Sequence, residues 1–255
     1  MGDDAVKFEE MINTIQLGDC YELIKNIPDK SIDLVIIDPP YEITNGVHTS
    51  GFLKNRNELD TTKQIFEKKL EIGIKNDILN ELIRIMKKIN IYIWCNKKQL
   101  LQYLNFFEKY NVVFECIIWN KYNCIPLTCN TYLPDKEYCL YFKEKGITLN
   151  NTYETSKTVY QIPLNVADKK IYKHPTIKPL EIVKNTILNS SKENDIVLDC
   201  FCGSGTTCVA AKETGRRFIG MEIDPEYHKI AVDRLNGINA NGQTSIFTDF
   251  DNLGE

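Results

Sequence analysis

Residues 195–206 read Asp-Ile-Val-Leu-Asp-Cys-Phe-Cys-Gly-Ser-Gly-Thr, and this segment indicates the fold class. An apolar run over 195–199 predicts a strand, and the turn with Gly203 and Gly205 leads into a predicted helix over 206–214. A second strand is predicted over 217–222. A strand, a tight turn, a helix and another strand in succession are typical of an α/β protein with a largely parallel sheet.

The rest of the chain continues this alternation of short apolar runs and amphipathic segments. Further strands are predicted over 12–17, 31–37, 90–95, 112–119 and 137–142. Further helices are predicted over 21–26, 65–88 with a break near Gly73, 97–109, 180–189 and 225–235. The sequence shows no internal repeat, so we expect a single α/β domain over residues 1–255.

Composition limits the environment of the protein. The 255 residues contain no apolar run as long as the roughly 18 residues of a membrane-spanning helix, and residues 1–10 are acidic, without a secretory signal. The nine cysteines are scattered and no two are spaced as Cys-x-x-Cys, which indicates reduced thiols in a cytoplasmic protein and no metal site. The net charge of −4 excludes binding to nucleic acid through overall charge alone.

The glycine turn predicts a site for a nucleoside-containing cofactor. Glycines allow a close approach of the backbone, and the start of the following helix offers free N–H groups. Glu222 ends the next strand, seventeen residues after Gly205, where a carboxylate can accept hydrogen bonds from both ribose hydroxyls. A dinucleotide and S-adenosylmethionine both fit, although Cys208 stands where the dinucleotide fingerprint has its third glycine. A packing turn that binds nothing is the simpler alternative.

A second motif, Asp38-Pro39-Pro40-Tyr41, follows the most apolar strand of the chain. Open α/β sheets bind their ligands at the carboxyl ends of strands. The Asp38 carboxylate and the Pro39 carbonyl can accept the two N–H groups of an exocyclic amine, while Tyr41 offers a face for stacking a planar base. A base in a duplex must flip out to reach such a pocket. A proline-stiffened turn with a solvated aspartate is the structural alternative.

Together, Asp38-Pro39-Pro40-Tyr41 and Phe201-Cys202-Gly203-Ser204-Gly205 resemble the motifs of S-adenosylmethionine-dependent DNA amino-methyltransferases. The tetrapeptide precedes the glycine motif by more than 150 residues, which looks like the circularly permuted β class of N6-adenine and N4-cytosine enzymes. The resemblance runs from about residue 15 to residue 235. It implies a Rossmann-like, mostly parallel seven-stranded sheet with one antiparallel strand and helices on both faces.

The resemblance also implies roles for individual residues. The catalytic residues would be Asp38, Pro39, Pro40 and Tyr41. The residues that bind S-adenosylmethionine, with no metal, would be Asp19, Cys20, Asp38, His174, Thr176, Lys178, Asp199, Phe201, Cys202, Gly203, Ser204, Gly205, Thr206, Glu222 and Ile223. Cys200 stands where the family usually has proline, and we expect a local change at the turn without loss of the cofactor.

The resemblance also implies that DNA binds at a short recognition insertion at about 147–173. Residues 151–178 carry five lysines against two acidic residues, a local positive charge suited to phosphates. The predicted substrate-binding residues are Tyr41, Lys54, Arg56, Lys169, Lys170 and Lys173. The short insertion is compatible with a short target, a second subunit of a homodimer, or single-stranded DNA, and a cognate restriction endonuclease is a further expected partner. The tail over 238–255 is polar.

The leading hypothesis is therefore an N6-adenine DNA methyltransferase that acts by direct in-line displacement. Asp at the first position of the tetrapeptide favours adenine in the family, and N4-cytosine methylation is the alternative within it. A nicotinamide-dependent oxidoreductase would explain Gly203, Gly205 and Glu222 but leaves Asp38 to Tyr41 without a role. A nucleic-acid-binding protein without catalysis is the alternative that is not an enzyme.

Overall fold

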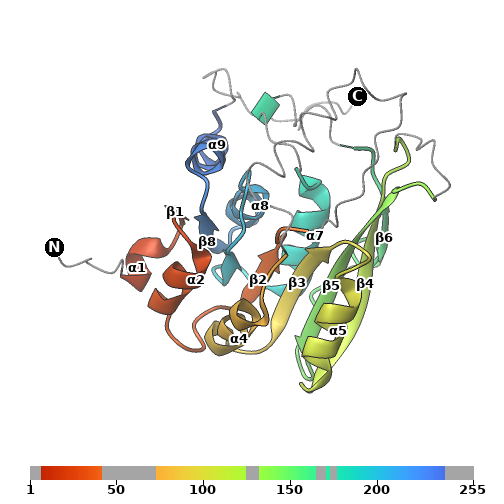
Figure 1. Ribbon diagram of the computed structural model, residues 1–255, viewed down its shortest axis with the longest axis horizontal. Helices are drawn as coiled ribbons and strands as arrows, with labels where there is room; N and C mark the ends of the chain where they lie inside the picture. Colours follow the sequence, from red (N-terminus) through yellow and green to blue (C-terminus); the bar gives the residue numbers. More distant parts are fainter. Residues whose placement is uncertain (1–6, 42–72, 125–131, 165–170, 173–176, 239–255) are drawn as a thin grey trace, which may run out of the picture.

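The computed structural model describes residues 7–41, 73–124, 132–164, 171–172 and 177–238. They form one eight-stranded sheet in the order β1-β8-β7-β2-β3-β5-β4-β6, with helices on both faces (Figure 1). All neighbouring strands pair in parallel except at β5, which is antiparallel to both β3 and β4. The predicted Rossmann-like fold with a single antiparallel strand is confirmed.

The elements follow the predicted alternation closely. The strands are β1 (Thr14–Leu17), β2 (Leu34–Ile37), β3 (Asn90–Cys95), β4 (Val112–Asn120), β5 (Lys136–Glu144), β6 (Val159–Gln161), β7 (Ile196–Asp199) and β8 (Arg217–Glu222). The helices are α1 (Phe8–Met11), α2 (Cys20–Leu23), the 3₁₀ helix η1 (Ile24–Asn26), α4 (Asn76–Ile85), α5 (Leu100–Glu108), α7 (Leu180–Ser190), α8 (Thr206–Glu213) and α9 (Pro225–Leu235).

Two differences from the predicted elements stand out. The sheet has eight strands and not seven, because Val159–Gln161, inside the expected insertion, pairs with the end of β4 and extends the sheet. The predicted helix over 65–88 begins only at Asn76 within the described part, and residues 65–72 lie outside it. None of the described helices is long and apolar enough to cross a lipid bilayer.

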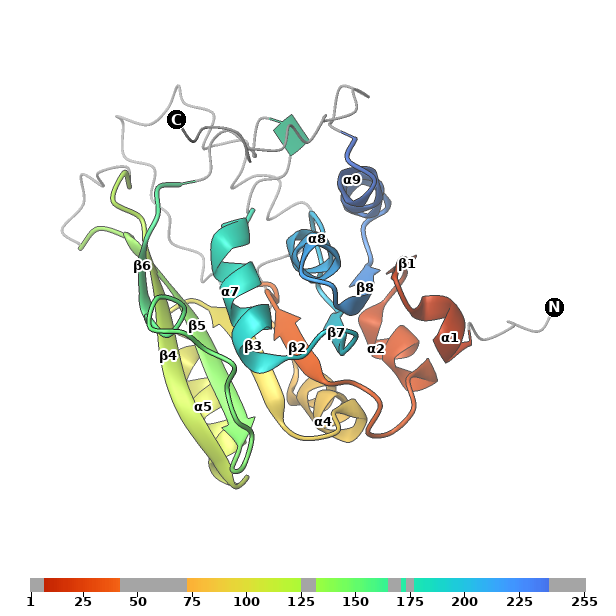
Figure 2. The ribbon, with the colours of Figure 1, turned by 180° about the vertical axis from the view of Figure 1, so that it is seen from behind.

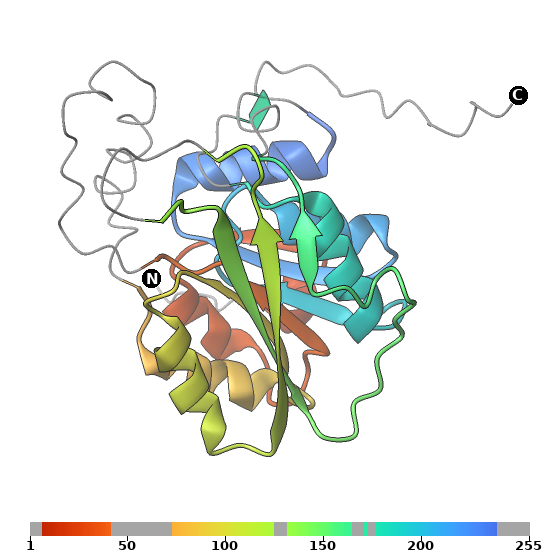
Figure 3. The ribbon, with the colours of Figure 1, turned by 90° about the vertical axis from the view of Figure 1, so that its right-hand side faces the viewer.

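The sheet separates two apolar cores. Along β2 and β3 the side chains alternate: Val35, Ile37 and Ile93 face the core under α2, α4 and α5, while Ile36 and Trp94 face the core under α7 and α8. Figure 2 shows α7, α8 and α9 grouped on one face, and Figure 3 shows the strands running between the two helical layers. Strands buried on both faces explain the nearly continuous apolar runs in the sequence.

The direction of each strand decides what gathers at one edge of the sheet. β1, β2, β3, β7 and β8 are parallel, so their carboxyl ends meet at the same edge. β5 runs the other way and therefore brings its first residues to that edge. In the β4–β5 register Trp119 lies opposite Glu137, so Lys121, just after β4, also lies there. The mixed sheet thus places charged residues from distant parts of the chain together.

Candidate active site and cofactor site

The predicted cofactor side of the site lies at the carboxyl ends of β1, β7 and β8. The Gly18 amide donates to the Glu222 carbonyl at 2.9 Å, which joins the Asp19 turn to the end of β8. The Cys202 amide donates to the Met221 carbonyl at 3.0 Å and joins residues 200–205, here called the glycine loop, to the same strand. Three predicted cofactor segments, around Asp19, Asp199 and Glu222, are therefore neighbours in the fold.

The glycine loop is held mainly through its backbone. The Asp199 Oδ1 atom accepts from the Phe201 amide at 3.0 Å, and the Gly205 amide donates to the Cys202 carbonyl at 2.7 Å. Gly203 and Gly205 have φ angles of 50° and 76°, in the left-handed region that favours glycine. A Cβ atom on Gly205 would lie 3.1 Å from the Cβ of Ala231 in α9. This glycine thus allows close packing of α9 as well as the turn.

Glu222 is the buried acid that the sequence predicts for a ribose. Its Oε2 accepts from the Gly203 amide at 2.8 Å and its Oε1 accepts from the Asp224 amide at 2.9 Å. Burial raises the pKa of this carboxyl above its ordinary value, and the two amides oppose that rise. Each carboxylate oxygen keeps further acceptor capacity, so the paired hydroxyls of a ribose can donate to it.

The Asp19 turn lies beside this acid. Asp19 caps α2, since its Oδ1 accepts from the Tyr21 amide at 2.9 Å, and its side chain is exposed at the rim. Leu17, which the sequence analysis did not select, pairs with Glu222 in the β1–β8 register. Leu17 and Ile223 are 51% and 62% exposed, unusual for aliphatic residues at strand ends. They offer apolar contacts for a planar ring next to the ribose acid.

The Asp38-Pro39-Pro40-Tyr41 motif follows β2, and a hydrogen bond holds its Pro40 carbonyl in place. The buried Gln99 side chain donates from Nε2 to the Pro40 carbonyl at 3.1 Å, and its Oε1 accepts from the Asn96 amide. Gln99 was not predicted to belong to the site. Its place at the start of α5, directly after β3, puts it at the same sheet edge as Asp38. Its amide fixes the turn that carries Tyr41.

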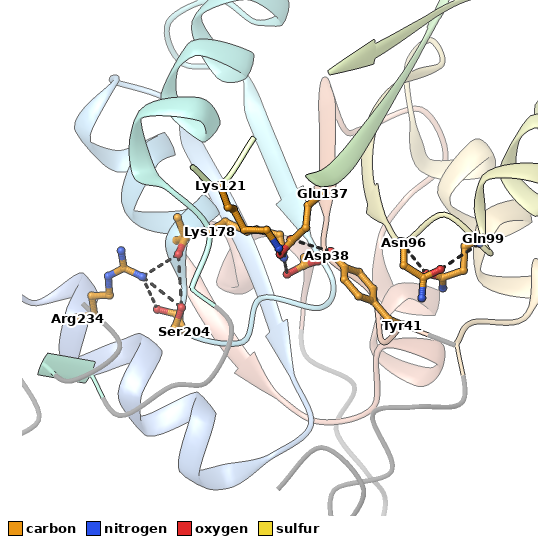
Figure 4. A network of polar contacts seen from close by, with 10 residues as sticks. Asp38, Tyr41, Asn96, Gln99, Lys121, Glu137, Lys178, Ser204 and Arg234 are labelled. Carbon is orange, nitrogen blue, oxygen red and sulfur yellow. Dashed lines mark hydrogen bonds and ion pairs between the residues drawn. The ribbon is translucent and has the colours of Figure 1, made fainter. Parts of the chain in front are cut away.

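Five side chains form a polar cluster around Asp38, which we call the ion network: Asp38, Tyr41, Lys121, Glu137 and Lys178 (Figure 4). The Lys178 Nζ lies 2.5 Å from the Asp38 Oδ2 and 3.3 Å from the Glu137 Oε2. The Lys121 Nζ lies 3.1 Å from the Glu137 Oε1, and the Tyr41 hydroxyl donates to the Glu137 Oε2 at 3.3 Å. The two lysines and the two carboxylates balance in charge.

The network gives its two carboxylates opposite pKa shifts. Burial raises the pKa of Asp38, and the Lys178 ammonium only partly offsets this. Burial alone would also raise the pKa of Glu137, but Lys178 and Lys121 together lower it to about 2. Burial disfavours the Lys178 ammonium, yet Asp38 and Glu137 outweigh burial and raise its pKa. Lys178 thus stays charged, Glu137 stays an anion, and Asp38 is the carboxylate that takes up a proton more readily.

Aromatic rings surround the Lys178 ammonium on the side of the motif. Its Nζ lies over the Tyr41 ring and over the Trp94 ring, 5.3 Å from each centroid. Cations are attracted to the faces of such rings. The Tyr41 ring, the predicted stacking surface for a base, thus faces a cation in this structure. The surroundings of Asp38 are therefore suited to positive charge.

A buried arginine supports the glycine loop from the other side. The Arg234 guanidinium donates from Nη1 to the Ser204 Oγ at 3.2 Å and to the Thr206 Oγ1 at 2.8 Å. Its guanidinium carbon lies 4.8 Å from the centroid of the Tyr172 ring. Arg234 was not predicted to belong to the site, because an arginine near the end of an amphipathic helix is normally solvated. It links α9, the glycine loop and the segment that leads to Lys178.

The structure brings most predicted site residues to one sheet edge: Asp19, Cys20, Asp38 to Tyr41, Lys178, Asp199, residues 201–206, Glu222 and Ile223. The others lie outside the described residues: Lys54, Arg56, Lys169, Lys170, Lys173, His174 and Thr176. The eight described cysteines are free thiols. No group of three or more His, Cys, Asp or Glu in the described part of the chain could hold a metal ion.

Comparison with known proteins finds a family model and several relatives that match this chain. Residues 32–233 match the model of the N6 and N4 methyltransferase family, described as DNA methylase. The Type II methyltransferase M.HinfI of Haemophilus influenzae is 31% identical over 91% of this chain and 70% of its own length. The DNA adenine methyltransferase YhdJ of Escherichia coli K12 is 28% identical, with 92% of this chain and 86% of that protein covered.

A solved structure gives the same picture. The crystal structure of the M1.HpyAVI–SAM complex superposes with a TM-score of 0.63 at 26% sequence identity. The superposition covers 87% of this chain and 98% of that one. The similarity therefore extends over most of this chain and nearly all of that one.

Proposed function

This chain belongs to the N6 and N4 DNA methylase family and is an S-adenosylmethionine-dependent DNA methyltransferase, and we propose that its target is the N6 amine of a flipped-out adenine. The observation that carries the proposal is the Asp38 carboxylate, held beside the Tyr41 ring at the same sheet edge as Glu222 and the glycine loop. Adenine is favoured over cytosine because a similar protein is named a DNA adenine methyltransferase.

Asp38 acts first as an acceptor that orients the amine. Its side chain is 23% exposed, so a hydrogen bond from an amine N–H is only partly screened by water. The Pro39 carbonyl, which follows directly in the chain, offers the second acceptor. Because both bonds and stacking on Tyr41 fix the amine, the nitrogen lone pair is held on the line of attack, and such orientation supplies much of the rate gain.

The reaction exchanges one bond for another at the methyl group. S-adenosylmethionine supplies the activated methyl carbon; the N–C bond forms as the S–C bond breaks, and the sulfonium becomes a neutral thioether. The positive charge that moves to the nitrogen is stabilised by the Asp38 carboxylate beside the Tyr41 ring, which already faces a cation. The extra N–H proton then leaves, and the raised pKa of Asp38 makes it the acceptor within reach.

The residues that would hold S-adenosylmethionine fit it chemically. Glu222 and Asp19 supply acceptors for hydroxyls and for an adenine amine, Leu17 and Ile223 supply apolar contacts, and the glycine loop supplies backbone polar groups. All these groups lie between the carboxyl ends of β1, β7 and β8, the place where open α/β sheets bind their ligands.

Several finer features belong to the same proposal. The chain order, with Asp38 before the glycine loop, supports membership in the circularly permuted β class. We propose duplex DNA as the principal substrate and a cognate restriction endonuclease as a functional partner, since M.HinfI is named a Type II methyltransferase. A homodimer would compensate for the short recognition insertion at about 147–173.

The test is transfer of a labelled methyl group from S-adenosylmethionine to mixed-sequence DNA, double- and single-stranded. The products are digested to nucleosides and identified by mass. We expect N6-methyladenine, with more product on duplex DNA. N4-methylcytosine would keep the fold and the role of Asp38 but contradict the base, and cofactor binding without any product on DNA would contradict the substrate.

A further inference from the structure

Glu137 has no role in the reaction as described above, yet it lies at the centre of the ion network. It comes from β5, the antiparallel strand, 99 positions after Asp38 in the chain. Its carboxylate meets three groups: Lys121 at 3.1 Å, Lys178 at 3.3 Å and the Tyr41 hydroxyl at 3.3 Å. A buried acid with three partners from different elements requires an explanation beyond packing.

The position of Lys178 creates a conflict with the proposed substrate. The Lys178 Nζ lies 2.5 Å from the Asp38 Oδ2 and over the Tyr41 ring. A target amine needs the same carboxylate oxygen region, and a target base needs the same ring. Lys178 therefore competes with the substrate for Asp38, and the ammonium must give way when the amine binds.

An ammonium that leaves Asp38 must keep a counter-ion. Lys178 is almost fully buried, with 7% of its side chain exposed, so an unpaired charge there would be strongly unfavourable. Glu137 already lies 3.3 Å from the Nζ, and a shift of about half an ångström would bring the pair to ordinary charge-assisted hydrogen-bond length. Glu137 is thus the second carboxylate within reach of the ammonium when a target amine takes its place on Asp38.

Glu137 is suited to this task because it remains charged. With Lys121 on its Oε1 and Lys178 near its Oε2, the Glu137 carboxylate is an anion throughout the physiological range, and its pKa is about 2. Asp38 has a single cation beside it. The two carboxylates therefore differ: Glu137 remains a counter-ion, whereas Asp38 can exchange the Lys178 ammonium for another donor.

We propose that Glu137 is a positioning residue that takes over the Lys178 ammonium, so that Asp38 becomes free to accept the target amine. The inference rests on the proposed function and adds to it a residue and an exchange of partners. No bond is made or broken in this step; the ammonium only changes its hydrogen-bond acceptor.

The test compares Glu137→Gln with the wild type in methyl transfer to mixed-sequence DNA. Glutamine keeps the size of the side chain but removes the charge, so Lys178 stays on Asp38 and competes with the amine. We expect kcat/KM for DNA to fall about tenfold or more, while the Kd for S-adenosylmethionine, measured by calorimetry, stays within about threefold. Glu144→Gln, the same change at the far end of β5, is the matched control and should keep wild-type transfer.

A second variant separates positioning from a merely structural role. Adding Lys178→Met to Glu137→Gln removes the competing ammonium and should restore part of the lost kcat/KM for DNA, by about threefold or more over Glu137→Gln alone. If the double variant is no better than the single one, Lys178 is needed for its own sake and the inference is wrong. Glu137→Asp, which keeps the charge on a shorter side chain, should lose less than Glu137→Gln; it replaces Glu137→Gln in the test if that variant does not fold.

A failure of the inference about Glu137 can be distinguished from a failure of the proposed function. Wild-type protein that transfers no methyl group to DNA overturns the proposed function and this inference with it. Wild-type transfer together with normal transfer by Glu137→Gln overturns the inference alone. A large rise in the Kd for S-adenosylmethionine in Glu137→Gln would also overturn it, because the network would then serve the cofactor.

Discussion

The glycine loop with Glu222 and the ion network lie at the same sheet edge but are built in different ways. The glycine loop is fixed by backbone amides, with Gly203 on Glu222, Cys202 on Met221 and Gly205 on Cys202, within 24 residues of sequence. The ion network is fixed by side-chain charges that come from positions 38, 121, 137 and 178. The predicted cofactor side is thus a frame of backbone hydrogen bonds, whereas the predicted target side is built from charged contacts that can exchange.

This difference implies that substitutions on the two sides should affect different steps. Changes in the ion network should alter transfer to DNA while leaving cofactor affinity intact. Changes at the glycine loop and Glu222 should alter cofactor affinity or stability. Each of the following variants tests whether the two sides of the site affect different steps.

The largest effect is expected for Asp38→Ala. The substitution removes the acceptor that orients the amine and stabilises its charge, so transfer should fall by about 10³-fold or more, with the Kd for S-adenosylmethionine within about threefold of wild type. Asp33→Ala is the control at the other end of β2, where Asp33 pairs with Lys87 and the Ile196 amide; it should lower the melting temperature but keep transfer. A large loss of cofactor affinity in Asp38→Ala would contradict the expectation that the two sides affect different steps.

Glu222→Gln should affect the predicted cofactor side of the site. An amide nitrogen cannot accept from the Gly203 or Asp224 N–H groups, and a hydrogen bond to a charged group contributes about 1.5–3 kcal/mol. We expect the Kd for S-adenosylmethionine to rise about tenfold or more, while kcat at saturating cofactor changes little. Glu226→Gln, an exposed position in the first turn of α9, is the matched control and should bind normally. Unchanged cofactor affinity in Glu222→Gln would remove this residue from the cofactor site.

A smaller effect is expected for Gly205→Ala. Its φ of 76° strains any L side chain, and the new Cβ would press on Ala231 in α9, so the free energy of unfolding should fall by about 1–3 kcal/mol and cofactor affinity with it. Gly146→Ala shares the strain, with a φ of 94°, but meets no atom within 4 Å. Denaturant unfolding of both variants therefore separates strain from contact, and equal losses would contradict the contact with α9.

A change in the pH dependence of stability is expected for Asp199→Asn. Burial raises the pKa of Asp199 from 3.8 to about 7, so the stability that this group contributes is fully present below about pH 4 and is lost as the pH rises through 7. Asp199→Asn cannot ionise, and its Oδ1 can still accept from the Phe201 amide. The fall in melting temperature between pH 5 and pH 8 should be shallower in this variant, with a remainder from Asp38 and Glu222. An identical slope in the two proteins would contradict the shifted pKa of Asp199.

The cofactor side could be predicted because its signals are local. Apolar runs of four to six residues mark β7 and β8, glycines mark the turn, and the spacing to Glu222 follows from one helix between two parallel strands. β6 was missed because three residues with one buried side chain carry no periodicity. Leu17 was missed because an aliphatic residue at the end of a strand is normally interpreted as part of the core.

The ion network could be predicted only in part. Asp38 and Tyr41 share a motif, and Lys178 was selected from its own segment as a residue for the cofactor, a role that stays a prediction. Its contact with Asp38, and the contributions of Glu137, Lys121 and Gln99, depend on which strands are neighbours and in which direction β5 runs. A sequence without that pairing presents Glu137 and Lys121 as ordinary solvated charges.

Periodicity and turn residues in the sequence were enough to establish the α/β fold class and to locate the two motifs, because these signals act within one or two elements. The methyl-transfer chemistry followed from the resemblance of the two motifs to a known family. Three features depend on the folded chain: Lys178 lies on Asp38, Glu137 pairs with two lysines, and Arg234 supports the glycine loop. They could not be predicted because backbone turns are fixed by neighbours in the chain, whereas buried charges are stabilised by whichever opposite charge the packing brings within a few ångströms.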